Sequence, residues 1–220
     1  MVTLDLSKSL GGVGALLLFI GIFPYINYFG IVDILGVILV LIALYNFAGY
    51  YKEKGIFNNA MYGVFAGIVG IVIAVVIGIA IVLSNITSFL EKLYPSWNGN
   101  LSTIPSLSGM TPVTSNLSFS DIVPFIVAAI TVIAVLWIFA IITAFFVRRS
   151  LSLASSKTSV RLFSTAGWLL LIGAALTIIL IGFLLMWIAL LILAIAFFTV
   201  KPQTEQPPMA TATSTPTTPT

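Results

Sequence analysis

Few residues of this 220-residue chain could do chemistry, and the most regularly placed of them form three Asn-x-Ser/Thr triplets. The triplets begin at Asn85, Asn100 and Asn116, within a long polar interval, 85–120, that interrupts an apolar sequence. Such an asparagine can accept a glycan only on a segment that is translocated across a membrane. Three triplets in one interval predict an extracellular loop with candidate glycosylation sites, although chance is an alternative because Asn, Ser and Thr are common in polar loops.

Groups that could catalyse a reaction are scarce. The sequence has no His and no Cys, which removes the commonest general base, thiolate nucleophiles and nearly all transition-metal sites. Its acidic residues fall at or beyond the ends of apolar runs, and Asp33 comes closest to the interior of one. We therefore expect no catalytic residues, no metal site, no cofactor and no enzymatic activity.

Several polar side chains within or beside apolar runs are candidates for a solute path. They are Asn27, Asp33, Asn46, Thr131 and Thr177. Their convergence on one interior cavity would favour a transporter or channel for a small solute, whereas dispersal would favour a structural role. Hydrogen bonds between helices, or back to a helix's own carbonyls, explain such groups without transport.

The composition indicates which elements must position these residues. Hydrophobic residues make up 60% of the chain and charged residues 7%, against about 25% charged in soluble domains, and the mean hydropathy is +1.21. The last apolar run would be about 58 Å long as one helix, so it must fold back near Thr177 to Gly182. We predict an all-α polytopic transmembrane bundle with about six spans. The apolar runs cover 10–23, 31–48, 61–83, 122–147 and 162–200.

This pattern divides the chain into four parts. Residues 1–84 are predicted to form spans one to three, and 85–120 an extracellular loop that opens with a short interfacial helix over 86–94. Residues 121–201 are predicted to form spans four to six, after a small polar connection over 150–160 between the fourth and fifth spans. The last part, 202–220, is rich in Thr and Pro and predicts a disordered tail.

Basic residues indicate the orientation. Six spans place Lys and Arg almost entirely on the side that also holds both termini, and such residues mark the cytoplasmic side. The topology-setting residues are Lys52, Lys54, Arg148, Arg149, Lys157, Arg161 and Lys201. We therefore predict a multi-pass protein of the cell membrane with cytoplasmic N- and C-termini. The net charge of +3 is explained by topology and does not indicate a nucleic-acid partner.

Small residues recur along the third span and predict a helix-packing face. They are Gly63, Ala66, Gly67, Gly70, Ala74 and Gly78. Small side chains let two helix backbones approach closely in lipid. The helix that packs there is either another span of the same chain or a second copy, so the expected partners are membrane lipid, a homo-oligomer or other membrane proteins.

The first and last hairpins have similar sequences. Residues 14–21 and 167–173 both place a Leu-rich run between two glycines, and Gly30 and Gly182 each follow nine residues later. The similarity predicts a parallel duplication of the hairpin, with chance as the alternative because Leu, Ile and Gly are abundant.

Four segments of the chain resemble one known family. They are 10–14, 41–44 together with 50–52, 56–60 and 175–183, of which Ile56 to Ala60 is the most distinctive. The sequence is similar to the domain of unknown function 996 family, uncharacterised multi-pass membrane proteins found mainly in archaea. The resemblance implies an archaeal origin and supplies no catalytic residues. We expect an integral membrane protein with a structural, scaffold or assembly role; the alternative is a transporter or channel for a small solute.

Overall fold

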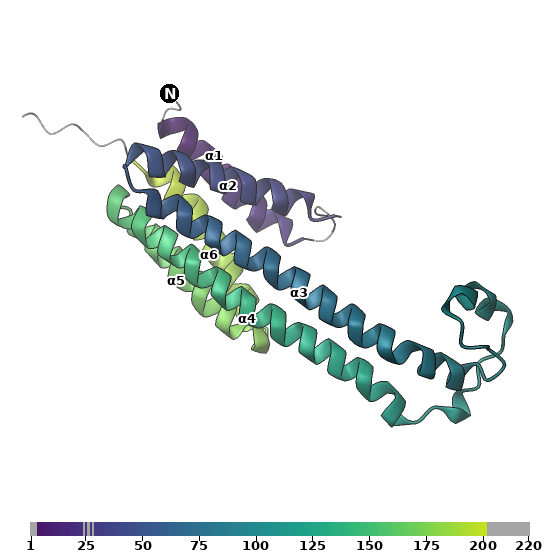
Figure 1. Ribbon diagram of the computed structural model, residues 1–220. Coiled ribbons are helices and arrows are strands. Elements are labelled where there is room, and N and C mark those ends of the chain that lie inside the picture. Colours follow the sequence, from purple (N-terminus) through teal and green to yellow (C-terminus); the bar gives the residue numbers. More distant parts are fainter. Residues whose placement is uncertain (1–3, 24, 26, 28, 202–220) are drawn as a thin grey trace, which may run out of the picture.

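Six apolar helices, each long enough to cross a membrane, build the part of the chain that the structure describes (Figure 1). This computed structural model describes residues 4–23, 25, 27 and 29–201. The helices are α1 (Leu4–Gly21), α2 (Ile31–Tyr50), α3 (Lys54–Leu93), α4 (Phe119–Thr158), α5 (Arg161–Leu176) and α6 (Ile181–Thr199). Three 3-10 turns are η1 (Leu101–Gly109), η2 (Thr114–Asn116) and η3 (Thr177–Ile179). The predicted all-α polytopic bundle is confirmed, whereas the predicted tail over 202–220 lies outside the described residues.

The helices form three antiparallel hairpins of unequal length. α3 and α4 have 40 residues each and are about 60 Å long, whereas the other four helices are about 24–30 Å long. The hairpins α1–α2 and α5–α6 pack beside the base of α3–α4 (Figure 1). The α3–α4 hairpin continues far beyond them and carries the polar loop at its tip.

α3 and α4 each extend beyond the predicted C-terminal end of their span. No separate interfacial helix forms over 86–94, because α3 continues without a break to Leu93. The polar pair Ser84 and Asn85 does not end the helix, since both side chains donate hydrogen bonds back to the carbonyl of Ile81. The expected polar connection over 150–160 is likewise mostly helix, because α4 runs to Thr158.

The core lies at the end where the six helices meet. Phe47, Phe163 and Phe197, from α2, α5 and α6, are fully buried against one another, with ring centroids 5.0–6.2 Å apart. Beside them the buried Ser150 hydroxyl of α4 donates a 2.5 Å hydrogen bond to the carbonyl of Ile56 in α3. The helices are therefore locked together at this end and diverge toward the other (Figure 1).

The second helices of the first and last hairpins begin in a similar way. The second helix of each begins after a residue with left-handed backbone, Gly30 (φ 71°) or Leu180 (φ 64°). The predicted fold-back near Thr177 to Gly182 is confirmed by η3 and the Leu180 cap. In the structure, Gly30 therefore corresponds to Leu180. The sequence comparison had paired Gly30 with Gly182, which lies two residues later. The duplication itself stays a prediction.

Candidate functional site

The candidate polar residues are dispersed over the bundle. Thr131 and Thr177 donate to carbonyls of their own helical segments, those of Val127 and Ala174. Asn46 lies near the C-terminal end of α2, and its buried amide nitrogen has no hydrogen-bond partner among the described residues. Asn46, Thr131 and Thr177 therefore lie on three different elements, α2, α4 and η3.

Asn27 and Asp33 are the pair that the structure does bring together. The Asn27 amide donates a 2.6 Å hydrogen bond to the Asp33 carboxylate and a 3.0 Å hydrogen bond to the carbonyl of Gly21. Its own side-chain oxygen accepts from the backbone N–H of Val32. These bonds satisfy the end of α1 and the start of α2, so the pair stabilises the hairpin turn.

The predicted packing face is used within the chain. Cβ atoms added at Gly63, Gly67, Gly70 and Gly78 would each meet α4, with Val147, Thr143, Phe139 and Val132 as nearest neighbours. Ala74 is buried on the same helix, and Ala66 is half-buried. The small residues of α3 therefore allow close packing against α4.

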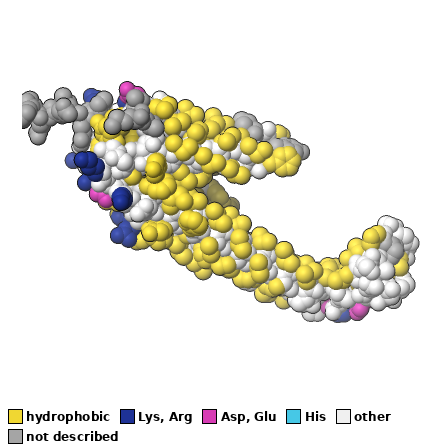
Figure 2. All heavy atoms as spheres, turned by 45° about the horizontal axis from the view of Figure 1, so that its top comes forward, with side chains coloured by type: hydrophobic (Ala, Val, Ile, Leu, Met, Phe, Trp, Pro, Cys, Tyr) yellow, Lys and Arg dark blue, Asp and Glu magenta, His cyan; other side chains and the backbone are white. Residues whose placement is uncertain are grey.

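The predicted topology-setting cations gather at the end where the helices meet. Figure 2 shows Lys and Arg side chains concentrated there, over the ends of several helices. Lys157 of α4 forms a 3.3 Å ion pair with Glu53, which also accepts a hydrogen bond from Gly55 at the start of α3. Tyr51 lies at this end with a buried hydroxyl, and burial, together with the nearby Tyr50, raises the pKa of the Tyr51 side chain.

The opposite tip of α3–α4 carries a small folded element, residues 94–118, which we call the tip unit. Its buried Trp97 donates a 2.8 Å hydrogen bond from Nε1 to the Thr103 hydroxyl, which in turn donates to the backbone carbonyl of Asn100. The backbone N–H of Val113 donates to the carbonyl of Leu93 at 2.7 Å, which returns the chain to the end of α3. Hydrogen bonds therefore stabilise the tip unit and join it to the end of α3.

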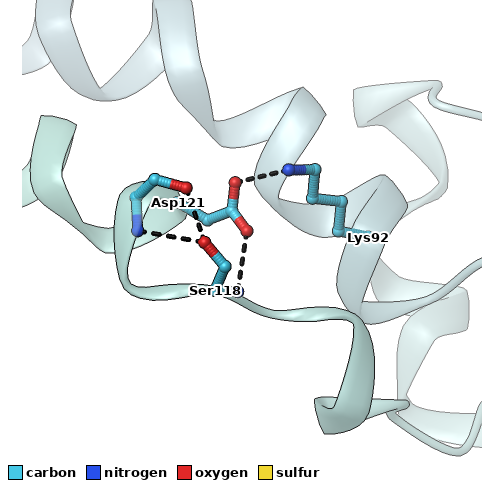
Figure 3. Close-up of polar contacts among 4 residues, drawn as sticks. Lys92, Ser118 and Asp121 are labelled. Carbon is cyan, nitrogen blue, oxygen red and sulfur yellow. Dashed lines mark hydrogen bonds and ion pairs between the residues drawn. The ribbon is translucent and has the colours of Figure 1, made fainter.

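An ion pair fastens α3 to α4 just below the tip unit (Figure 3). The Lys92 ammonium lies 2.5 Å from the Asp121 carboxylate, which also accepts a 2.9 Å hydrogen bond from the backbone N–H of Ser118. Ser118 caps α4 through its hydroxyl, so Asp121 and Ser118 form a capping box.

The three glycosylation candidates lie in different settings. Asn85 is inside α3, where its amide donates a 2.8 Å hydrogen bond to the carbonyl of Ile81. Asn100 and Asn116 are exposed in the tip unit, and the Asn100 side-chain oxygen accepts from both the backbone and the hydroxyl of Ser102. Whether any of them carries a glycan stays a prediction.

The α5–α6 hairpin ends about halfway along the apolar part of α4. A Cβ on Gly167 would lie 3.2 Å from the Cα of Arg148, and Trp137 Nε1 donates a 3.2 Å hydrogen bond to the carbonyl of Ala175. The α4 segment from Trp137 to Arg148 is about 16 Å long, and apolar residues continue beyond it to Ile122. The side chains at the turn, Ile178 to Ile181, are apolar and exposed.

Sequence reasoning missed the tryptophans that join the hairpins. Trp137 links α4 to α5, and Trp187 of α6 donates a 3.1 Å hydrogen bond to the carbonyl of Phe19 in α1. Tryptophan within an apolar run is the one signal that could have been followed, because a buried indole N–H needs an acceptor. No group of three His, Cys, Asp or Glu side chains that could hold a metal occurs within the described ranges.

Comparisons with known proteins identify one family and one relative of this chain. Residues 32–191 match the family described as "Protein of unknown function (DUF996)". The chain is also 27% identical over 195 residues to the uncharacterized protein MJ1644 of Methanocaldococcus jannaschii, covering 87% of this chain and 90% of that protein. No solved structure matches the chain.

Proposed function

We propose that this chain, which belongs to the DUF996 family, is a membrane scaffold or assembly component. In this proposal the charged end anchors the protein at the cytoplasmic face of the cell membrane. The α3–α4 hairpin then crosses the bilayer and presents the tip unit on the outer side. We propose no catalytic activity for the chain.

The observation that carries this proposal is the projection of a folded element beyond the rest of the bundle. α3 and α4 are about twice as long as their neighbours, and the tip unit is hydrogen-bonded at their end. A rigid rod that ends in a folded element suits the display of a binding surface, because loops on rigid elements commonly carry binding functions. The tip unit also exposes apolar side chains, such as those of Leu101 and Ile104, to a partner.

The orientation within this proposal rests on charge. Lys52, Lys54, Arg148, Arg149 and Arg161 lie at the end where the helices meet, with both ends of the described chain. Cations near span ends favour the cytoplasmic side. In the proposed orientation, the tip unit, with Asn100 and Asn116, lies outside the cell.

The alternative, a transporter or channel, has less support. A solute path needs polar groups that converge, and those of this chain are separated. Thr131 and Thr177 bond within their own helical segments, while Asn27 and Asp33 bond to each other at a hairpin turn. Each of these groups already has a structural role.

A loop replacement tests the scaffold proposal. Residues 95–117 are exchanged for a Gly/Ser linker, and the assemblies formed in native membranes are sized after cross-linking. We expect the wild-type chain to occur in a larger assembly, and the variant to insert into the membrane but to be absent from that assembly. A matched control variant, Ser156→Ala at the charged end, should keep the assembly.

Reconstitution into liposomes tests the alternative. We expect the wild-type protein to give no flux of small neutral solutes above that of empty liposomes. Flux from the wild-type chain, together with an assembly unchanged by the loop replacement, would contradict the scaffold proposal.

A further inference from the structure

A hollow of about 400 Å³ is lined by residues of the α3–α4 hairpin and of the α5–α6 hairpin. It is lined by Gly67, Gly70, Ala140, Thr143, Leu170 and Met186, among others. Small side chains on α3 and α4 leave the space open, and its walls are almost entirely apolar. Because the hollow follows the part of α4 that carries no charge, it lies within the membrane-spanning level of the molecule.

A cation, Arg148, directly follows the last residue of α4 that lines this hollow. Val147 is the lining residue closest along α4 to the charged end, and Arg148 follows it directly. The Arg148 guanidinium lies 3.5 Å from the ring centroid of Trp168 on α5. Gly167, which has no side chain, lets α5 approach the backbone of Arg148. The stacked indole therefore holds a positive charge one residue beyond Val147, on the side of the hollow that faces the charged end of the bundle.

We propose that this hollow is a binding site for an anionic phospholipid. One hydrocarbon chain of the lipid fills the apolar hollow, and the phosphate of the headgroup contacts Arg148. The two parts of the ligand match the two parts of the site. The hydrocarbon chain meets the apolar surface of the hollow within the membrane, and the phosphate meets the Arg148 guanidinium. A guanidinium is the side chain best suited to a phosphate, and basic sites between helices on the cytoplasmic side bind such headgroups.

Charge complementarity selects this occupant over a second helix or a zwitterionic lipid. A partner helix would fill the hollow without needing Arg148, and a zwitterionic headgroup carries no net charge. Arg148 is placed by its contact with Trp168, whereas Arg149, the next residue, is exposed elsewhere on α4. The adjacent arginines therefore provide a matched test of whether one positioned cation or general basicity binds the lipid.

The test measures binding of phosphatidylglycerol and phosphatidylcholine to the delipidated full-length protein by native mass spectrometry. Arg148→Gln is compared with Arg149→Gln, and Ala140→Trp, which fills the hollow, with Ala134→Trp, which places the same side chain on an exposed part of α4. Each variant is first checked for helix content and for a single peak in size-exclusion chromatography. If an arginine variant fails that check, the tryptophan pair decides.

We expect R148Q to weaken phosphatidylglycerol binding about fivefold, the effect of one basic side chain near an anionic lipid surface. R149Q and A134W should bind as the wild type does, whereas A140W should lose most of the binding. Equal binding of the two lipids, or equal losses in R148Q and R149Q, would overturn the proposal. It is also wrong if A140W breaks a protein assembly but leaves lipid binding unchanged, since the hollow would then hold a partner helix.

Discussion

The indole N–H of Trp187 in α6 donates a 3.1 Å hydrogen bond to the backbone carbonyl of Phe19 in α1, 168 residues away. The rings of the two residues are stacked, with centroids 4.7 Å apart and planes 5° from parallel. Phe19 lies in the last turn of α1, where carbonyls have no partner within the helix. The hydrogen bond therefore gives the Phe19 carbonyl a partner at the end of α1, and the contact joins the first hairpin to the last.

We expect Trp187→Phe to destabilise the protein by about 1 kcal/mol, because it removes the N–H donor but keeps a stacked ring. Trp187→Ala should cost more, about 2–3 kcal/mol, because it also removes the half-buried ring. Thermal unfolding in detergent micelles measures both. Equal stability of W187F and wild type would show that the hydrogen bond contributes nothing.

A glycine pair explains how α5 and α6 approach each other. Gly173 and Gly182 face one another, and a Cβ at Gly182 would overlap the backbone of Gly173 and Thr177. Backbone atoms cannot rotate away as a flexible side chain can, so Gly182→Ala should separate the two helices. We expect a loss of about 1–3 kcal/mol in the free energy of unfolding.

Gly49 provides the control for that substitution, because a Cβ there would meet nothing within 4 Å. Gly49→Ala should leave stability unchanged or raise it by up to about 1 kcal/mol through helix propensity. Similar losses in G49A and G182A, measured in the same unfolding assay, would contradict the close-approach explanation.

The sequence predicted those features that depend on the bilayer or on local chemistry. The length of the run 162–200 required a fold-back, and the bilayer thickness placed it near Thr177 to Gly182. The glycines of α3 indicated close packing, although the sequence could not show that α4 was their partner.

Features that depend on three-dimensional neighbours could not be predicted. Ser84 and Asn85 resemble a helix end, but both side chains bond to Ile81, so α3 continues. Ser150 resembles part of a polar loop, yet it is fully buried because the Ile56 carbonyl lies opposite. A polar residue thus ends a helix or stays inside it according to where its hydrogen-bond partner lies.

The ion pair between Lys92 and Asp121 should contribute less to the stability of the tip of α3–α4 than the helix cap at Ser118 does. Lys92 is half exposed, so Lys92→Ala should produce a small increase in hydrogen exchange of the tip-unit amides, and this effect should vanish in 1 M salt. Ser118→Ala should cost about 1 kcal/mol at either salt concentration, because it removes the N-cap of α4. Hydrogen exchange followed by mass spectrometry measures both variants. The same salt dependence in both would show that the cap acts only through the ion pair.

The turn of the last hairpin should lie within the hydrocarbon of the bilayer. Leu180 is 73% exposed and the neighbouring side chains are apolar, while α5 ends level with Trp137, about 16 Å from Arg148. The hydrocarbon layer is about 30 Å thick, so the turn should stop short of the far surface. The chain contains no cysteine, so a single introduced thiol reports its own position.

We therefore expect Leu180→Cys to resist a membrane-impermeant maleimide applied from either side of sealed vesicles. Ser156→Cys should be labelled only from the side of the charged end, and Thr114→Cys only from the opposite side. Efficient labelling of L180C from the side that labels T114C would show that the hairpin crosses completely.

The three Asn-x-Ser/Thr triplets should differ as glycan acceptors if the tip unit is outside the cell. Asn100 and Asn116 are exposed in irregular or 3-10 structure, whereas Asn85 lies within α3 with its amide bonded to the Ile81 carbonyl. An acceptor asparagine must present a free amide nitrogen, so we expect glycans at Asn100 and Asn116 and none at Asn85 in a glycosylating host. Asn→Gln variants at each position, followed by mass spectrometry, make the assignment. A glycan at Asn85 would require α3 to unwind before residue 93, and no glycan at any position would remove one support for the proposed orientation.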